Sequence, residues 1–250
     1  LQTGAITRAS TATDGTQSNH LSGLTALSAD GRYVAFESFA SNLVAGDSNG
    51  IPDIFVKDLQ TGAITRASTS ASGGQPSSGI YHNGVSISAD GRYVAFSSRA
   101  TGLVPSDSNR TWDIFVKDLQ TGAITHASTA ANGVQANGTS ESPSISPDGR
   151  YVAFASEASN LVSGDTNGSR DIFIKDLQTG AIARASVSAA GSQGYYEGSY
   201  ASFLSADSRY VTFASSASNF VPDDTNNFWE WDIFVAPNPL LLSPSSGVAS

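Results

Sequence analysis

Oxygen-bearing side chains recur in four short polar loops, each leading into an apolar run that begins with aspartate. Each loop has the pattern Asp-x-Asn before that aspartate, and the fourth copy carries a two-residue insertion. Alternating carboxylate and amide oxygens in a tight loop are ligands that calcium prefers, with affinities of roughly 10⁻⁴–10⁻³ M in extracellular modules. Calcium is therefore a predicted cofactor. The candidate metal ligands are Asp47, Asn49, Asp53, Asp107, Asn109, Asp113, Asp165, Asn167, Asp171, Asp224, Asn226 and Asp232.

A structural interpretation of the same loops stays open. The pattern is shorter than an EF-hand loop and lacks its terminal Glu. Asp and Asn also stabilise turns by bonding to nearby backbone groups. In that case Asp47 and Asn49 form Asx-turns, and Asp53 tethers its loop through backbone amides.

A second group of side chains could bind a ligand through aromatic rings. Aromatic residues beside acids can stack on sugar rings or anchor a protein partner. Alternatively, these rings cover the core beneath long loops. The candidate ligand-binding residues are Trp112, Tyr195, Tyr196, Tyr200, Trp229, Trp231, Glu197 and Glu230.

Sequence patterns that mark catalysis are absent, and no catalytic residue is assigned. The chain has no Gly-x-Ser-x-Gly elbow, no His-Glu-x-x-His and no phosphate-binding Gly-Lys-Ser/Thr loop. The alternative is a small enzyme of the lyase or hydrolase type acting on polysaccharide. Its acid/base pair would be His82 near Tyr81, with Glu141 or Glu197 across the molecule.

Charge and composition exclude several classes of protein. The chain carries 13 Lys and Arg against 22 Asp and Glu, a net charge of −9. This balance argues against binding to nucleic acid or to an anionic membrane surface. The absence of cysteine excludes disulfides and thiolate chemistry. No run of about 18 apolar residues is present, so no membrane insertion is expected.

These candidate residues belong to a repeat that occurs four times. Leu-Gln-Thr-Gly-Ala-Ile begins at Leu1, Leu59, Leu119 and Leu177. Asp-Gly-Arg-Tyr-Val-Ala-Phe begins at Asp30, Asp90 and Asp148, with an altered copy at Asp207. Each repeat divides into four short strand-like runs joined by turn residues, and none has a sustained helical period. The sequence therefore predicts an all-β, four-bladed β-propeller of four-stranded antiparallel blades.

The two ends of the chain predict how this ring closes. The repeats span about 11–69, 70–129, 130–187 and 188–235, and the last lacks its outer strand. Residues 1–10 supply a spare copy of that strand. Pairing it with the last blade would remove an exposed sheet edge. Residues 1–236 are thus predicted to form a single propeller, followed by a Pro/Ser-rich tail or linker at 237–250.

Two runs resemble a known repeat family. Ser146–Phe154 (Ser-Pro-Asp-Gly-Arg-Tyr-Val-Ala-Phe) and Asp53–Gly62 (Asp-Ile-Phe-Val-Lys-Asp-Leu-Gln-Thr-Gly) are similar to TolB-type (WD40-like) β-propeller repeats. The family includes envelope proteins, peptidase-associated propellers and secreted proteins. The resemblance therefore implies a secreted, periplasmic or cell-surface location. TolB itself resembles a six-bladed ring with an extra N-terminal domain, which this sequence does not show.

Internal comparison separates two faces of the predicted ring. The hairpin turns are nearly identical between repeats, whereas the loops on the opposite face differ. Scaffold segments repeat and recognition segments diversify, so we expect the binding site on the variable face. The repeated Gly-x-Gln, and the arginines that follow the Asp-Gly turns, are predicted to be structural. The sequence thus favours an extracytoplasmic, non-enzymatic binding or scaffold module for a glycan or protein.

Overall fold

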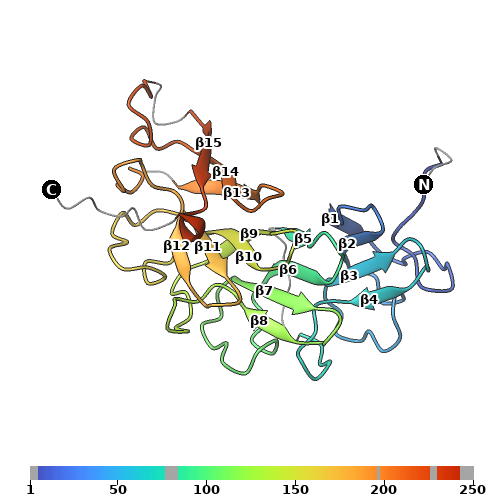
Figure 1. The fold of residues 1–250 in the computed structure, drawn as a ribbon. Helices are drawn as coiled ribbons and strands as arrows, with labels where there is room; N and C mark the ends of the chain where they lie inside the picture. Colours follow the sequence, from blue (N-terminus) through green and yellow to red (C-terminus); the bar gives the residue numbers. More distant parts are fainter. Residues whose placement is uncertain (1–4, 77–83, 196–197, 226–229, 243–250) are drawn as a thin grey trace.

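The chain folds into four antiparallel sheets that follow one another along the sequence (Figure 1). This computed structural model describes residues 5–76, 84–195, 198–225 and 230–242. Each sheet is a meander of neighbouring strands, and we call the sheets blades 1 to 4. Their strands are β1 (Ser22–Leu27), β2 (Tyr33–Ser38), β3 (Asp53–Asp58) and β4 (Ile64–Arg66); β5 (Val85–Ile87), β6 (Tyr93–Ser98), β7 (Asp113–Asp118) and β8 (Ile124–His126); β9 (Ser140–Ile145), β10 (Tyr151–Ser156), β11 (Asp171–Asp176) and β12 (Ile182–Arg184); and β13 (Ser199–Leu204), β14 (Tyr210–Ser215) and β15 (Asp232–Pro237).

The two middle strands of each blade form its core. All six residues of β3, β7 and β11 are buried, as are all six of β10. A strand that is buried on both faces has apolar residues at successive positions. This explains why Tyr-Val-Ala-Phe shows no alternation of apolar and polar residues. In blade 4 burial instead alternates along β14 and β15, because one face of this sheet is open.

Tight turns join the first and second strands on what we call the turn face. In blade 2 the Ser88 hydroxyl donates to Asp90 at 2.6 Å and accepts the amide of Tyr93 at 2.9 Å. Gly91 has a φ of +75°, a conformation that glycine adopts without steric cost. In blade 4 the corresponding residue is Ser208, at a φ of +61°.

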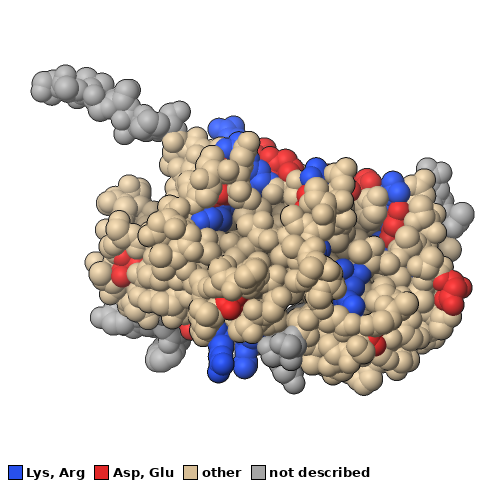
Figure 2. All heavy atoms as spheres, turned by 90° about the horizontal axis from the view of Figure 1, so that it is seen from below, with Lys and Arg blue, Asp and Glu red and all other residues tan. Residues whose placement is uncertain are grey.

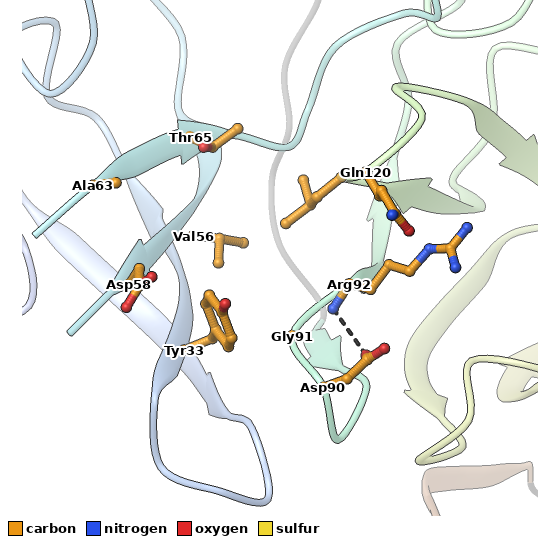
Figure 3. Close-up of a pocket in the computed structure, with 10 residues that line it drawn as sticks. Tyr33, Val56, Asp58, Ala63, Thr65, Asp90, Gly91, Arg92 and Gln120 are labelled. Carbon is orange, nitrogen blue, oxygen red and sulfur yellow. Dashed lines mark hydrogen bonds between the residues drawn. The ribbon is translucent and has the colours of Figure 1, made fainter. Parts of the chain in front are cut away.

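Each blade packs face to face on the next, and one apolar cluster fills each of the three junctions. Between blades 1 and 2 the Tyr33 ring lies over Gly91, toward which it points in Figure 3. A groove of about 380 Å³ opens beside this contact, and the same repeat positions line one of about 570 Å³ between blades 2 and 3. Because it recurs with the repeat, we interpret this groove as part of the junction.

Two of the three lysines in the chain reinforce junctions between blades, and the third, Lys57, holds the N-terminal segment against blade 1. Lys117 in β7 donates to the carbonyl oxygens of Thr69 and Ser70 in the preceding blade at 3.1 and 3.0 Å. It also donates to Gly122 of its own blade at 2.7 Å. Lys57 and Lys175 hold the corresponding carbonyls. Burial lowers the pKa of all three ammonium groups, and carbonyl oxygens replace the water they lose.

Blade 4 differs from the predicted closed ring. Its sheet has only three strands, and residues 5–10 form no strand among the described residues. The blades follow an open arc, with the N-terminal segment beside blade 1 and blade 4 at the other end (Figure 1). The packing at each junction fixes the angle between neighbouring blades. Four blades at this angle leave β15 far from the segment that was predicted to complete it.

Part of the predicted tail packs on the propeller. Asn238 is fully buried, and its amide side chain donates to the Ser208 carbonyl at 3.0 Å. It also caps a short 3₁₀ turn, η1 (Pro239–Leu241), and Leu240 packs against the junction between blades 3 and 4. Residues 243–250 lie outside the described part. No helix in the described residues combines the length and apolarity needed to span a membrane.

The Tyr33–Gly91 contact predicts that Gly91→Ala is more destabilising than Gly122→Ala. Both glycines have a φ near +75°, so alanine is strained equally at either position. A Cβ on Gly91 would lie 2.1 Å from the Tyr33 ring, whereas nothing lies within 4 Å at Gly122. We expect an additional loss of about 1–3 kcal/mol for Gly91→Ala, the usual range for overpacking. Urea denaturation measures both variants, and equal losses would contradict this role of the contact.

Candidate ligand-binding site on the loop face

Two of the predicted aromatic residues meet at the face opposite the turns, which we call the loop face. Tyr200 lies at the start of β13 and Trp231 directly before β15. Their ring centroids are 5.0 Å apart in an edge-to-face arrangement. Tyr200 is 39% exposed and Trp231 46% exposed. Both rings therefore belong to a fixed pair with accessible surface.

An arginine from blade 3 completes this cluster. The guanidinium of Arg170 lies 4.5 Å from the Tyr200 ring centroid, a cation–π contact. Arg170 also donates to Glu141 at 2.9 Å and to Glu157 at 2.6 Å. Burial alone would lower the pKa of Arg170, but the bond to Glu157 and the charge of Glu141 raise it. The arginine is therefore a fixed cation, while half-exposed Glu157 remains accessible to a ligand.

Three members of this cluster were not in the predicted ligand-binding set. Arg170 occupies the repeat position directly before the third strand, where the other blades have Pro52, Trp112 and Trp231. This variation between repeats could have indicated from the sequence that Arg170 belongs to a binding site. The pairing of Glu141 and Glu157 with Arg170 was not recognisable, because only the strand pairing of blade 3 brings both glutamates to this arginine.

The other predicted aromatic and acidic residues are spread along the loop face. Trp112 precedes β7 in blade 2, with the Arg99 guanidinium 5.7 Å from its ring centroid. Tyr195 is 58% exposed, and its backbone amide donates to Asn219. Glu230 is exposed beside Trp231. Tyr196, Glu197 and Trp229 lie outside the described residues.

The alternative enzymatic site lies mostly outside the described residues. Tyr81, His82 and Glu197 lie outside the described residues, and Glu141 is paired with Arg170. His20 packs against the ring of Phe39.

The Asp-Asn-Asp loops of blades 1 and 3 enclose an arginine. Arg66, at the end of β4, lies 3.2 Å from Asp47 and 3.3 Å from Asp53. Asp53 also accepts hydrogen bonds from Ser68 at 2.6 Å and Asn49 at 3.1 Å. In blade 3 Arg184 takes the same place between Asp165 and Asp171, at 3.1 and 3.0 Å. Here the guanidinium supplies the positive charge that a cation would otherwise provide.

These loops also support the structural interpretation. Asn49, Asn109 and Asn167 each accept the backbone amide two residues later, which is an Asx-turn. Asp53, however, is held by side chains rather than by backbone amides. The glutamine of Gly-x-Gln accepts loop amides, such as Thr166 by Gln193 at 3.0 Å, which confirms its structural role. The predicted Arg–acid pairs are also present, as Arg32–Asp58, Arg92–Asp118 and Arg150–Asp176.

Blade 2 lacks the arginine and leaves its carboxylates without a cation between them. His126 replaces Arg66 and Arg184, and its Nε2 lies 2.9 Å from Asp113. No side chain donates a hydrogen bond to either carboxyl oxygen of buried Asp107, and one oxygen of Asp113 also lacks a partner. Burial, and then the nearby charge of Asp113, raises the pKa of Asp107.

Blade 4 presents its acids to an open hollow. Asp224 and Asp232 both line a space of about 520 Å³ at the edge of the blade. Asn226 lies outside the described residues. Across the described part of the chain, no three His, Cys, Asp or Glu side chains are arranged to hold a metal ion. Calcium binding therefore stays a prediction.

Comparison with known proteins identifies the fold. No protein-family model matches the chain, and no curated protein has a matching sequence. Among solved structures, TolB from Acinetobacter baumannii is similar with a TM-score of 0.52 and 20% identity, over 88% of this chain and 41% of that one. The chain has a TolB-like β-propeller fold. It spans less than half the length of that TolB chain.

Two further solved structures show weaker similarity. The putative TolB from Agrobacterium tumefaciens has a TM-score of 0.40 and 17% identity, over 88% of this chain and 81% of its own. The β-propeller domain of the Trilobed protease from Pyrococcus furiosus has a TM-score of 0.44 and 13% identity, over 87% and 54%. At these identities the TolB-like resemblance describes the fold alone.

The exception in blade 2 predicts that His126→Arg stabilises the protein. The guanidinium would bridge Asp107 and Asp113 as Arg184 bridges its two carboxylates. Satisfying buried charged groups contributes roughly 1–3 kcal/mol, which chemical denaturation at neutral pH measures. The reverse change in blade 3, Arg184→His, is the matched control and should destabilise.

The same variant should show a defined pH dependence. The pKa of Asp107 is higher in the folded protein than in the unfolded chain. The free energy of unfolding therefore falls as the pH rises from the pKa of the unfolded chain through that of the folded protein. The advantage of His126→Arg should therefore shrink in acid, below the pKa of the unfolded carboxyl. A gain that is equal at acid and neutral pH would contradict this origin.

Proposed function

We propose that the chain is an extracytoplasmic, non-enzymatic binding or scaffold module that recognises a glycan or a protein through its loop face. The observation that carries the proposal is the cluster of Tyr200, Trp231 and Arg170, with Arg170 held by two glutamates. Rigid aromatic rings with accessible surface contribute large contact energy at little loss of conformational freedom. The half-exposed Glu157 adds a hydrogen-bond acceptor beside them.

The charge distribution supports this choice of ligand class. The net charge of −9 disfavours nucleic acid, which proteins bind mainly by neutralising phosphates. On the face drawn in Figure 2, acidic and basic atoms are interspersed over a largely uncharged surface. Neutral glycans and protein surfaces fit such a surface better than a polyanion does. The resemblance of the repeats to the TolB type is what supports a periplasmic, secreted or cell-surface location.

Replacing either ring of the aromatic pair should weaken ligand binding. A glycan array in calcium buffer, followed by calorimetry with a soluble hit, provides the measurement. Tyr200→Ala and Trp231→Ala should each weaken binding at least about 10-fold, since buried aromatic anchors contribute about 2 kcal/mol or more. Phe39→Ala, which removes a half-exposed ring from blade 1, is the matched control. Unchanged affinity in both loop-face variants would contradict the proposal that Tyr200 and Trp231 bind the ligand.

The same experiment distinguishes the enzymatic alternative. A binding module retains the bound glycan unchanged, whereas a lyase or hydrolase depletes it with time. If no glycan binds, protein partners are captured on the wild-type chain and compared with Trp231→Ala. Turnover of any glycan would contradict the non-enzymatic proposal.

Calcium is proposed to bind where the carboxylates lack an arginine, foremost at Asp107 and Asp113 of blade 2. Binding to the folded state raises stability by RT ln(1 + [Ca²⁺]/Kd), about 1.4 kcal/mol at 10 times Kd. Millimolar calcium should raise the melting temperature, and EDTA should reverse the rise. In His126→Arg the guanidinium would take the cation's place, so the response should shrink. An unchanged wild-type melting temperature would refute calcium binding.

A further inference from the structure

The two ends of the blade arc each carry one half of a junction that is complete three times inside the chain. Val56 of blade 1 is 4% exposed because blade 2 covers it. Its counterpart in blade 4, Val235, is 64% exposed, and the adjacent Ile233 is 74% exposed. At the other end, Leu27 of β1 is 59% exposed, although its counterpart Ile87 in blade 2 is 9% exposed. The two exposed faces are the two sides of one kind of interface.

The tyrosine and glycine that meet at two of the three inner junctions are separated at the ends of the arc, whereas the third junction has Ser208 in place of the glycine. Tyr33 lies over Gly91 of the next blade, and the corresponding pair recurs between blades 2 and 3. Tyr210, the equivalent tyrosine of blade 4, is 44% exposed. Gly31, the equivalent glycine of blade 1, has nothing within 4 Å of the point that a Cβ would occupy. The exposed Tyr210 side chain and the open space above Gly31 thus lie at opposite ends of the arc.

Blade 4 also has an apolar hollow where blade 1 has an isoleucine. Ile64 of the outer strand β4 packs against the cluster formed by Phe36, Ala40, Leu43 and Phe55. The equivalent positions in blade 4 contribute to a hollow of about 460 Å³ lined partly by Phe213, Phe220, Val221 and Phe234. The turn after blade 3 and the tail residues Pro239 and Leu242 also line this hollow. It lies where the outer strand of blade 4 would pack.

The N-terminal segment repeats the sequence of an outer strand. Residues 5–10 are identical in sequence to residues 63–68, which contain β4, and the side chain of Ile6 is fully exposed. The turn after this segment is already formed, because Thr11 bridges Gln17 as Thr129 bridges Gln135 in blade 2. Arg8 also bonds Gln17 at 2.7 Å, the distance between Arg184 and Gln193 in blade 3.

The position of this segment shows which blade it fits. Lys57 of blade 1 donates to the carbonyl oxygens of Thr11 and Ala12 at 2.9 and 3.0 Å. Lys117 of blade 2 holds the turn after β4 in the same way. Residues 5–10 therefore lie beside blade 1 as the outer strand of a preceding blade would. Blade 4 of the same chain is at the other end of the arc (Figure 1).

We propose that the chain assembles head to tail with copies of itself, residues 5–10 of one copy completing blade 4 of the next. Blade 1 of the first copy then covers the exposed face of that blade 4, continuing the junction found between the inner blades. This inference concerns the ends of the arc and does not rest on the proposed function of the loop face.

The register of the inner blades defines the contacts at this interface. Val56 pairs with Thr65 in blade 1, so Val235 would pair with Thr7 of the neighbouring copy. Arg8 would enter the acidic hollow lined by Asp224 and Asp232, as Arg66 enters between its own two aspartates. Pro237 cannot donate the bond that Asp58 gives to Ala63, so the pairing would end there.

Such an interface joins two different surfaces and is therefore heterologous. Heterologous contacts form a closed ring when the rotation closes and an open filament when it does not. Light scattering after gel filtration should give a mass that is a multiple of 25.7 kDa. Ile233→Lys should produce monomers, because it buries an unpaired charge in the interface. Val134→Lys, at a half-exposed position in the loop between β8 and β9, is the matched control and should assemble. A monomeric wild-type chain would overturn the proposal.

Cysteine pairing tests the arrangement and its direction. The chain has no cysteine, and Thr7 and Val235 are both exposed, so Thr7→Cys and Val235→Cys should fold normally. Directly opposed strand residues have Cα atoms about 5.5 Å apart, within the range of a disulfide. Mixing the two single variants under oxidation should give a covalent dimer of twice 25.7 kDa. Thr7→Cys mixed with Gln60→Cys, in an exposed turn, should give little.

The same chemistry separates assembly from closure within one chain. If the double variant forms its disulfide only inside a monomer, and the mixed single variants form none, residues 5–10 close the ring in cis. That result would overturn the proposal. Covalent ladders from the double variant, lost on addition of Ile233→Lys, would support it.

Discussion

The structure depends on covering both faces of each apolar sheet. The middle strands are apolar on both sides, so each face of a blade is exposed to water unless another blade covers it. Stacking solves this for the inner blades, where Val56 and its neighbours are almost completely buried. A linear stack still has two uncovered ends, and the exposure of Leu27, Ile233 and Val235 is the direct consequence. The open arc and its end faces follow from the same constraint.

Polar groups tie the stacked blades together and set the geometry of the loop face. The buried lysines join successive blades through backbone carbonyls. Arginines at the ends of the outer strands fix the Asp-Asn-Asp loops, as Arg66 and Arg184 show. This framework leaves the residue before each third strand free to vary, and it is there that Arg170 and Trp231 approach Tyr200. A repetitive scaffold thereby supports one non-repetitive cluster.

Much of the fold was predictable because each repeat is locally consistent. The Asp-Gly turns, the apolar runs and the outer-strand sequence all recur, and each predicts its own element. Tyr200 and Trp231 could likewise be selected from the sequence as aromatic residues in variable loops. Their contact with Arg170, and the hold of Glu141 and Glu157 on that arginine, could not. Strand pairing within blade 3 brings the two glutamates to Arg170, and the packing of blade 3 against blade 4 brings Arg170 to Tyr200.

The ends of the chain show most clearly what could not be predicted from the sequence. The sequence by itself determined four blades, their strand order and the presence of a spare outer strand at residues 5–10, because these depend on local patterns repeated in register. It could not determine whether that strand reaches blade 4 of its own chain. The angle between blades decides this, and it results from side-chain packing summed over three junctions. Only the tertiary structure fixed that angle, and with it the open arc.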